Sequence, residues 1–167
     1  MIKRTAEDIK QIIVHCSDSD VLGHDNVDTI RDWHLKRGFE DIGYHYVILK
    51  RPHLDGKHVR KGRDVFLVGA HCQGHNEDSI GICLTGRYKF STDQFTSLVN
   101  LLDGLCTVFN IDNIHGHSYF NRNKTCPNFD HSPMKDISKN ARLEVPRPYA
   151  DNEGIWEYDV ENILPGI

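Results

Sequence analysis

The 167-residue sequence lacks an excess of basic residues, which removes the commonest basis for binding nucleic acid. It holds 20 lysines and arginines against 24 aspartates and glutamates, so its formal net charge is -4 with histidine neutral. A protein that neutralises a phosphate backbone needs a clustered surplus of positive charge. We therefore expect no nucleic-acid partner.

Long hydrophobic runs are also missing. The N-terminal apolar run, Ile12 to Val14, is far shorter than the core of a signal peptide. No stretch approaches the roughly 20 apolar residues that a transmembrane helix needs. The sequence thus predicts no membrane insertion, and it predicts a protein that is made in a cytoplasm and at first stays there.

Cysteines are few and odd in number, and they lack the dense, regular spacing of a secreted disulfide framework. Reduced thiols are therefore expected at Cys16, Cys72, Cys83, Cys106 and Cys126. The length suits one domain, which at this size buries about two thirds of its unfolded surface. No internal repeat is present, and a monomer is the default expectation.

The spacing of apolar residues predicts an α/β fold in which a central mixed β-sheet is flanked by helices. The expected strands are 11–15, 44–50, 57–60, 64–68, 79–85 and 111–115. The expected helices are 27–37, capped by Asn26, and 92–109, opened by a capping box of Ser91 and Gln94. Alternation along 44–50 would place Tyr44, Tyr46 and Ile48 on one face.

The C-terminal segment differs in composition from the rest of the chain. Residues 141–167 are acidic, hold three of the six prolines and show no period. We expect a domain over residues 1–140, followed by an extended tail that wraps the domain through Trp156.

The polar loop GHSYFNRNKTCPNFD, residues 116–130, holds several candidate functional residues. His117 and Cys126 are residue types that bind zinc, but their spacing lies outside the usual zinc-finger patterns. Taken alone, the pair also fits a surface histidine and a buried thiol. Spacing does not reveal a third ligand.

Four segments in order carry a resemblance to a known family. They are IIVHCS, IRDWHLKRGFEDIGYHYVI, VGAHCQGHNEDSIGICLTG and GHSYFNRNKTCPNFD. Together they resemble the signature segments of the type-2 N-acetylmuramoyl-L-alanine amidases, a family that includes amidase-type phage lysozymes and peptidoglycan recognition proteins. The resemblance runs from about Ile12 to Asp130, and its Cys-Pro-Asn-Phe-Asp ending is most similar to the phage lysozymes.

The resemblance implies a zinc ion in a groove on one face of the domain. The implied ligands are His15, His117 and Cys126, a set of three that leaves a fourth position open, as in catalytic zinc sites. His115, two residues before His117, is the alternative ligand, although the Gly-His context favours His117.

The resemblance also implies catalytic and substrate-binding side chains. Tyr44 would orient water or donate to the developing oxyanion, and Lys124 would stabilise that oxyanion from a position facing the same way as Cys126. A further set would line the groove and bind substrate: His71, Gln73, His75 and Asn76. For His34 and His45 we expect packing and orienting roles.

The function implied is zinc-dependent hydrolysis of the lactyl to L-alanine amide of bacterial peptidoglycan. The setting we expect is a phage or prophage endolysin in the host cytoplasm, which reaches the wall by holin-type release. One alternative is a recycling amidase that acts on soluble muropeptides. Others are a noncatalytic peptidoglycan-binding module and a protein that binds and restrains a phage RNA polymerase, as some phage lysozymes do.

Overall fold

A five-stranded sheet forms the middle layer of the structure. In this computed structural model, which describes residues 1–134, the strands are β1 (Gln11–Cys16), β2 (Tyr46–Ile48), β3 (Val59–Lys61), β4 (Ser79–Leu84) and β5 (Asn113–Gly116). Their order across the sheet is β3-β2-β4-β1-β5. β1 runs parallel to β4 and β5, β2 runs parallel to β4, and β3 is antiparallel to β2. The predicted mixed sheet is confirmed.

The two central strands, β1 and β4, are buried along their whole length. Their sequences, QIIVHC and SIGICL, are rich in isoleucine and valine, as is typical of strands covered on both faces. A sheet with such strands at its centre needs a helix on each side.

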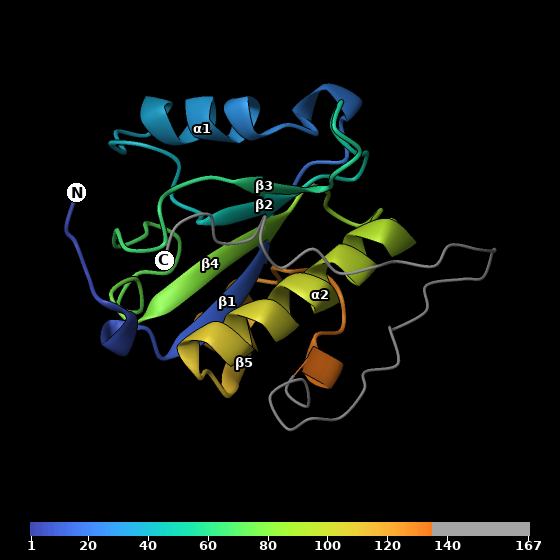
Figure 1. Cartoon of the computed structure of the whole chain (residues 1–167). Coiled ribbons are helices and arrows are strands. Elements are labelled where there is room, and N and C mark those ends of the chain that lie inside the picture. Colours follow the sequence, from blue (N-terminus) through green and yellow to red (C-terminus); the bar gives the residue numbers. More distant parts are fainter. Residues whose placement is uncertain (135–167) are drawn as a thin grey trace.

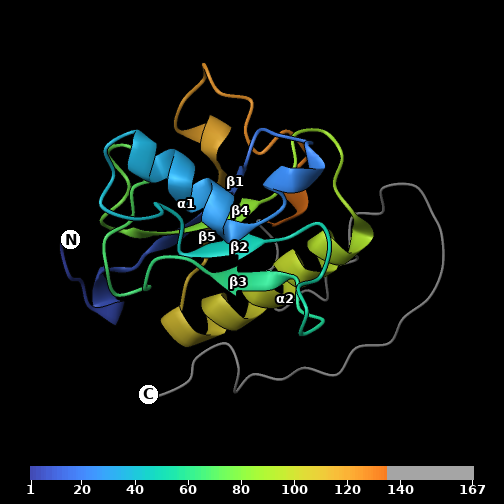
Figure 2. The same cartoon turned by 90° about the horizontal axis from the view of Figure 1, so that it is seen from above.

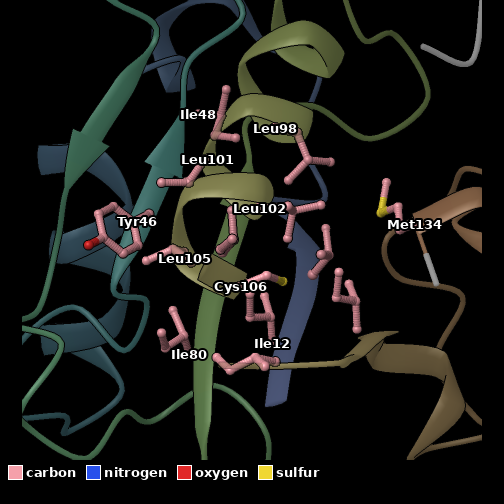
Figure 3. Close-up of a cluster of buried hydrophobic side chains, with 14 of the residues drawn as sticks. Ile12, Tyr46, Ile48, Ile80, Leu98, Leu101, Leu102, Leu105, Cys106 and Met134 are labelled. Atoms are coloured by element: carbon pink, nitrogen blue, oxygen red, sulfur yellow. The ribbon is translucent and has the colours of Figure 1, made fainter. Parts of the chain in front are cut away.

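α2 (Thr92–Phe109) covers one face of the sheet. Ser91 Oγ accepts from the Gln94 amide and Gln94 Oε1 accepts from the Ser91 amide, so the predicted capping box is present. Figure 3 shows Leu98 and Leu102 of this helix in one buried cluster with Ile12 of β1, and all three are fully buried.

α1 (Val27–Lys36) covers the opposite face, and Figures 1 and 2 show the two helices on either side of the sheet. The Asn26 side chain caps α1 by accepting a 2.9 Å hydrogen bond from the Thr29 amide. Ile30 then packs against Val47 of β2 and Cys83 of β4 in a second buried cluster. Three layers result, with one core on each side of the sheet.

The predicted strand over residues 64–68 is wrong. Asp64 starts a turn, because its carbonyl accepts from the Leu67 amide at 3.0 Å and its side chain accepts from the Phe66 amide at 2.8 Å. Leu67 makes only an isolated bridge to Lys3. The apolar residues after Asp64 suggested a strand, but the aspartate bends the chain.

The predicted shared face of Tyr44 and Tyr46 is also wrong. Tyr46 belongs to the core beneath α2, whereas Tyr44 packs with the cluster beneath α1. The strand begins only at Tyr46, and shortly before it the chain passes close to Ala70 at Gly43, where a Cβ atom would lie 2.1 Å from the Ala70 carbonyl oxygen. Alternation therefore starts after Tyr44, and Tyr44 is left on the face that carries α1.

The expected boundary near residue 140 and the tail over 141–167 lie outside the described residues. Within residues 1–134, no helix is long and apolar enough to cross a membrane.

Candidate metal centre and groove

The strand register places His15 and His117 side by side. Val14 of β1 pairs with Gly116 of β5 in parallel, and each histidine is the next residue along its chain. Their ring centroids are 4.7 Å apart, and His15 is only 1% exposed. Both lie at the carboxyl ends of parallel strands, where open α/β sheets bind their ligands.

The loop after β5 brings Cys126 to the same point. η3 (His117–Tyr119) turns the chain, and the Ser118 amide then donates a 2.8 Å hydrogen bond to the Cys126 carbonyl. Gly116 allows the return of the loop, since a Cβ atom there would lie 2.7 Å from Pro127 Cδ. The Cys126 sulfur finally accepts from the Cys16 amide at 3.1 Å.

Three metal-ligand atoms converge as a result. The donor atoms of His15, His117 and Cys126 all lie within 4.8 Å of one another, and this is the one such group of His, Cys, Asp or Glu side chains in residues 1–134. Two imidazoles and a thiol are ligands that zinc prefers. His115 is not in the group, because its ring stacks on Tyr119 with centroids 4.2 Å apart. The residues present therefore fit a zinc ion.

The electrostatic surroundings favour the neutral histidines that a metal requires. Burial, reinforced by His117, holds the pKa of His15 well below its usual value. Burial and then the charge of Lys124 lower the pKa of His117. The side chain of Cys16, followed by burial, raises the pKa of the Cys126 thiol. A metal ion reverses that last effect, because a coordinating thiol loses its proton.

The His71 ring contacts the His15 ring. Its Nδ1 atom is 3.1 Å from His15 Nε2, and the side chain of His71 is buried. The ring occupies space that only a glycine leaves open, since a Cβ atom at Gly81 would lie 2.5 Å from it. His71 thus contacts a candidate ligand and fixes the orientation of its ring.

A groove of about 630 Å³ opens over these residues. One wall is the α1 face that holds Trp33 and Arg37, and the other is the loop 123–128. Tyr44 and Lys124 both line it, and the Tyr44 ring centroid lies 5.0 Å from that of His15. The two residues with expected catalytic roles therefore share the groove with His117 and Cys126, two of the three candidate ligands, whereas His15 is buried beside it.

The four residues with expected substrate-binding roles do not lie together in the groove. His71 lines it, but Gln73, His75 and Asn76 are not among the residues that do. The Asn76 side chain accepts from the amides of His71 and Cys72, both at 2.8 Å. The His75 ring packs on Phe120 with centroids 4.0 Å apart. The Asn76 side chain thus bonds to its own loop.

The packing and orienting roles expected of His34 and His45 stay predictions, and the structure shows each ring bound to a backbone amide. His34 Nδ1 accepts from the Gly43 amide at 2.7 Å, and burial lowers its pKa to about 4. His45 Nδ1 accepts from the Gly81 amide at 2.8 Å, and burial lowers its pKa to about 3. Both rings are therefore neutral near pH 7.

Several groove residues have no functional role in the sequence-based prediction. Trp33 in α1 and Arg37 at the C-cap of α1 line one wall of the groove. At the other end, Arg87 forms a 3.0 Å ion pair with Asp18. The sequence holds a signal for Trp33 and Arg37, because a tryptophan and an arginine four residues apart on one helix face suggest that this face borders solvent.

An α/β sheet with a His-His-Cys group in a groove at its carboxyl edge defines an enzyme with a candidate metal centre. The model of the N-acetylmuramoyl-L-alanine amidase family, Amidase_2, matches residues 5–129. The chain belongs to this family, and the activity is that of an N-acetylmuramoyl-L-alanine amidase. The predicted family and enzyme class are confirmed.

Similar proteins agree with this assignment. The chain is 36% identical over 132 residues to the endolysin of Escherichia phage T7, covering 74% of this chain and 83% of that protein. It is 34% identical over 132 residues to the endolysin of Klebsiella phage KP32, with the same shares covered.

Solved structures share the fold. The amidase LysC from Clostridium intestinale URNW superposes with a TM-score of 0.66 at 26% identity, covering 83% of this chain and 91% of that one. The wild-type Drosophila peptidoglycan recognition protein PGRP-LB gives a TM-score of 0.62 at 24% identity, with 89% of each chain covered. The match to PGRP-LB shows a shared fold and nothing further.

Proposed function

We propose that this amidase is zinc-dependent and acts as a phage or prophage endolysin on the lactyl to L-alanine amide of peptidoglycan. The observation that carries the zinc dependence is the convergence of the donor atoms of His15, His117 and Cys126 within 4.8 Å. The endolysin setting is supported by the phage relatives. Release through a holin-type lesion belongs to the same proposal.

Each groove residue then has a defined task. When bound, zinc would act as a Lewis acid that lowers the pKa of a bound water to about 7 and polarises the carbonyl of the substrate amide. Burial raises the pKa of Tyr44 well above its usual value, so its phenol keeps its proton and remains a hydrogen-bond donor. Lys124 brings a fixed positive charge to the groove, where an oxyanion develops during amide hydrolysis.

The groove also suits a peptide that carries carboxylates. Its α1 wall offers the apolar surface of Trp33 and Phe39 together with the guanidinium of Arg37, whose carbon lies 5.4 Å from the Phe39 ring centre. Aromatic and arginine side chains of this kind bind peptides through stacking and charge-assisted hydrogen bonds. Peptidoglycan stem peptides offer carboxylates to such an arginine and aliphatic groups to such aromatic rings, which supports muropeptide as the substrate.

Metal removal tests the proposal directly. Purified protein is incubated with peptidoglycan, and the release of L-alanine amino termini is measured before chelation, after chelation and after zinc is added back. We expect release to stop with chelator and to return with zinc, without new reducing sugar ends. Full release in the metal-free protein would refute zinc dependence.

The endolysin setting is tested by the choice of substrate. We expect faster release from intact sacculi than from soluble muropeptides at equal stem-peptide concentration. The opposite preference would favour the recycling amidase.

Replacing Tyr44 with phenylalanine is expected to lower kcat roughly 100-fold while zinc content stays at one per chain, because one proton donor is lost and no ligand is touched. Steady-state kinetics and metal analysis measure the two quantities. Tyr46→Phe is the matched control, since Tyr46 is a buried tyrosine on the α2 side of the sheet. A wild-type kcat in Tyr44→Phe would restrict Tyr44 to packing.

A further inference from the structure

Arg4 is a buried cation that precedes β1 and contacts backbone carbonyls. It is 8% exposed, and its guanidinium donates to the carbonyls of Val65, Glu77 and Ser79 at 2.9, 3.1 and 2.7 Å. Within residues 1–134, no carboxylate forms an ion pair with Arg4. Burial of a charge is costly, and here the carbonyls, together with the charges of Asp78 and Asp8, offset that cost.

The contacts of Arg4 converge on the loop that carries His71. Besides Glu77 and Ser79, Arg4 Nη1 donates to the Asn76 carbonyl at 3.2 Å. Nη2 of the same guanidinium lies 3.1 Å from His45 Nε2. The His45 ring is in turn 5.6 Å from the His71 ring, centroid to centroid, with the planes nearly perpendicular. Arg4 therefore holds the segment 76–79, and its guanidinium packs beside the ring that borders His71.

Asn76 extends this path to a candidate metal ligand. Its Oδ1 atom accepts from the amide of His71 at 2.8 Å, which fixes the backbone that bears the imidazole. His71 Nδ1 then lies 3.1 Å from His15 Nε2. Three separate hydrogen bonds thus join Arg4 to the Asn76 backbone, the Asn76 side chain to the His71 backbone, and the His71 ring to His15.

We propose that Arg4 and Asn76 are positioning residues that fix the ring of His15 through His71. The inference rests on the proposed zinc site, because its functional consequence is tighter metal binding. Residues that contact a metal ligand, but not the metal, orient the ring of that ligand. Their loss typically lowers metal affinity or activity 10- to 100-fold. His15 uses Nε2 for His71, so its other ring nitrogen is the one available to a metal.

The test compares zinc release among four variants of the full chain. Zinc loss to a chromophoric chelator is timed for Arg4→Met, Asn76→Ala, Asn76→Asp and Arg63→Met. We expect about 10-fold faster release from Arg4→Met and Asn76→Ala. Asn76→Asp should release zinc at the wild-type rate, because aspartate keeps the oxygen that accepts from the His71 amide.

Arg63→Met separates positioning from general loss of stability. Arg63 is 7% exposed and donates to the carbonyls of Ile42, Val68 and Asp41, so its loss also removes a buried guanidinium. It has no hydrogen bond to Asn76, His71 or His15. We expect a lower unfolding temperature with wild-type zinc release. Equal acceleration in Arg63→Met, or a wild-type rate in Asn76→Ala, would refute the proposal.

A second measurement is independent of zinc and separates failure of this inference from failure of the metal site. Nitrogen-15 NMR of the metal-free protein follows exchange of the ring proton shared by His15 and His71. We expect about 10-fold faster exchange in Asn76→Ala than in the wild type or Asn76→Asp. An unchanged exchange rate in Asn76→Ala would overturn the positioning role, whether or not the protein binds zinc. Failure of the wild-type protein to bind zinc would refute only the zinc site.

Discussion

Replacing Cys126 with serine is expected to abolish both zinc retention and amide hydrolysis. The thiolate is the one anionic donor of the group, and serine leaves two neutral imidazoles, His15 and His117, to hold a dication. Zinc affinity should fall by more than the roughly 100-fold upper range seen when a residue behind a ligand is lost. Metal analysis after dialysis and release of L-alanine termini measure both effects.

Cys16 provides the matched control for this variant. It also lines the groove, and its amide donates to the Cys126 sulfur, but its thiol is not one of the three converging donors. Cys16→Ala should therefore keep one zinc per chain, because alanine leaves the backbone amide in place. Full zinc content in Cys126→Ser, or equal zinc loss in both variants, would remove Cys126 from the site.

The layers of the fold could be predicted from the sequence because the residues that form them repeat with a clear period. Ile12 to Val14 predicts a strand covered on both faces, and Leu98, Leu102 and Leu105 predict the buried stripe of α2. Prediction failed where a tertiary contact changed the local path. Tyr44, which follows the close crossing of Gly43 and Ala70, lies on the other face from Tyr46, and no spacing in the sequence encodes that crossing.

The candidate ligands could be predicted only through family resemblance. His15 and His117 are more than 100 residues apart, and the register that joins them is a property of the β1–β5 pair. Once Val14 is known to pair with Gly116, the two histidines follow from geometry. Spacing alone offered only His117 and Cys126.

The groove lining was harder to predict than the ligands. The segment from His71 to Asn76 was expected to bind substrate, but the Asn76 side chain is used by backbone amides of its own loop. Polar side chains in a loop form hydrogen bonds either to a ligand or to the backbone of the loop itself, and amino-acid composition does not distinguish the two cases. Arg37, which does line the groove, was given no functional role from the sequence.

Replacing Lys124 with alanine is expected to leave zinc binding intact while kcat falls roughly 10²- to 10³-fold, the cost of losing one group that stabilises an oxyanion. Lys124 lines the groove in the loop that ends at Cys126, and its charge adds to the burial that lowers the pKa of His117. The lysine therefore acts electrostatically at the candidate metal centre without contributing a donor atom. KM should change less than kcat, because the oxyanion forms only in the transition state.

Arg122→Ala is the control, because Arg122 is an exposed cation of the same loop that does not line the groove. It should keep the wild-type kcat, and Lys124→Arg should recover part of the lost rate because the charge is restored. If Arg122→Ala slowed hydrolysis as much as Lys124→Ala, the effect would come from the overall charge of the loop and not from a lysine beside the oxyanion. A rise in KM alone would instead make Lys124 a substrate-binding residue, since uniform binding of substrate and transition state leaves kcat unchanged.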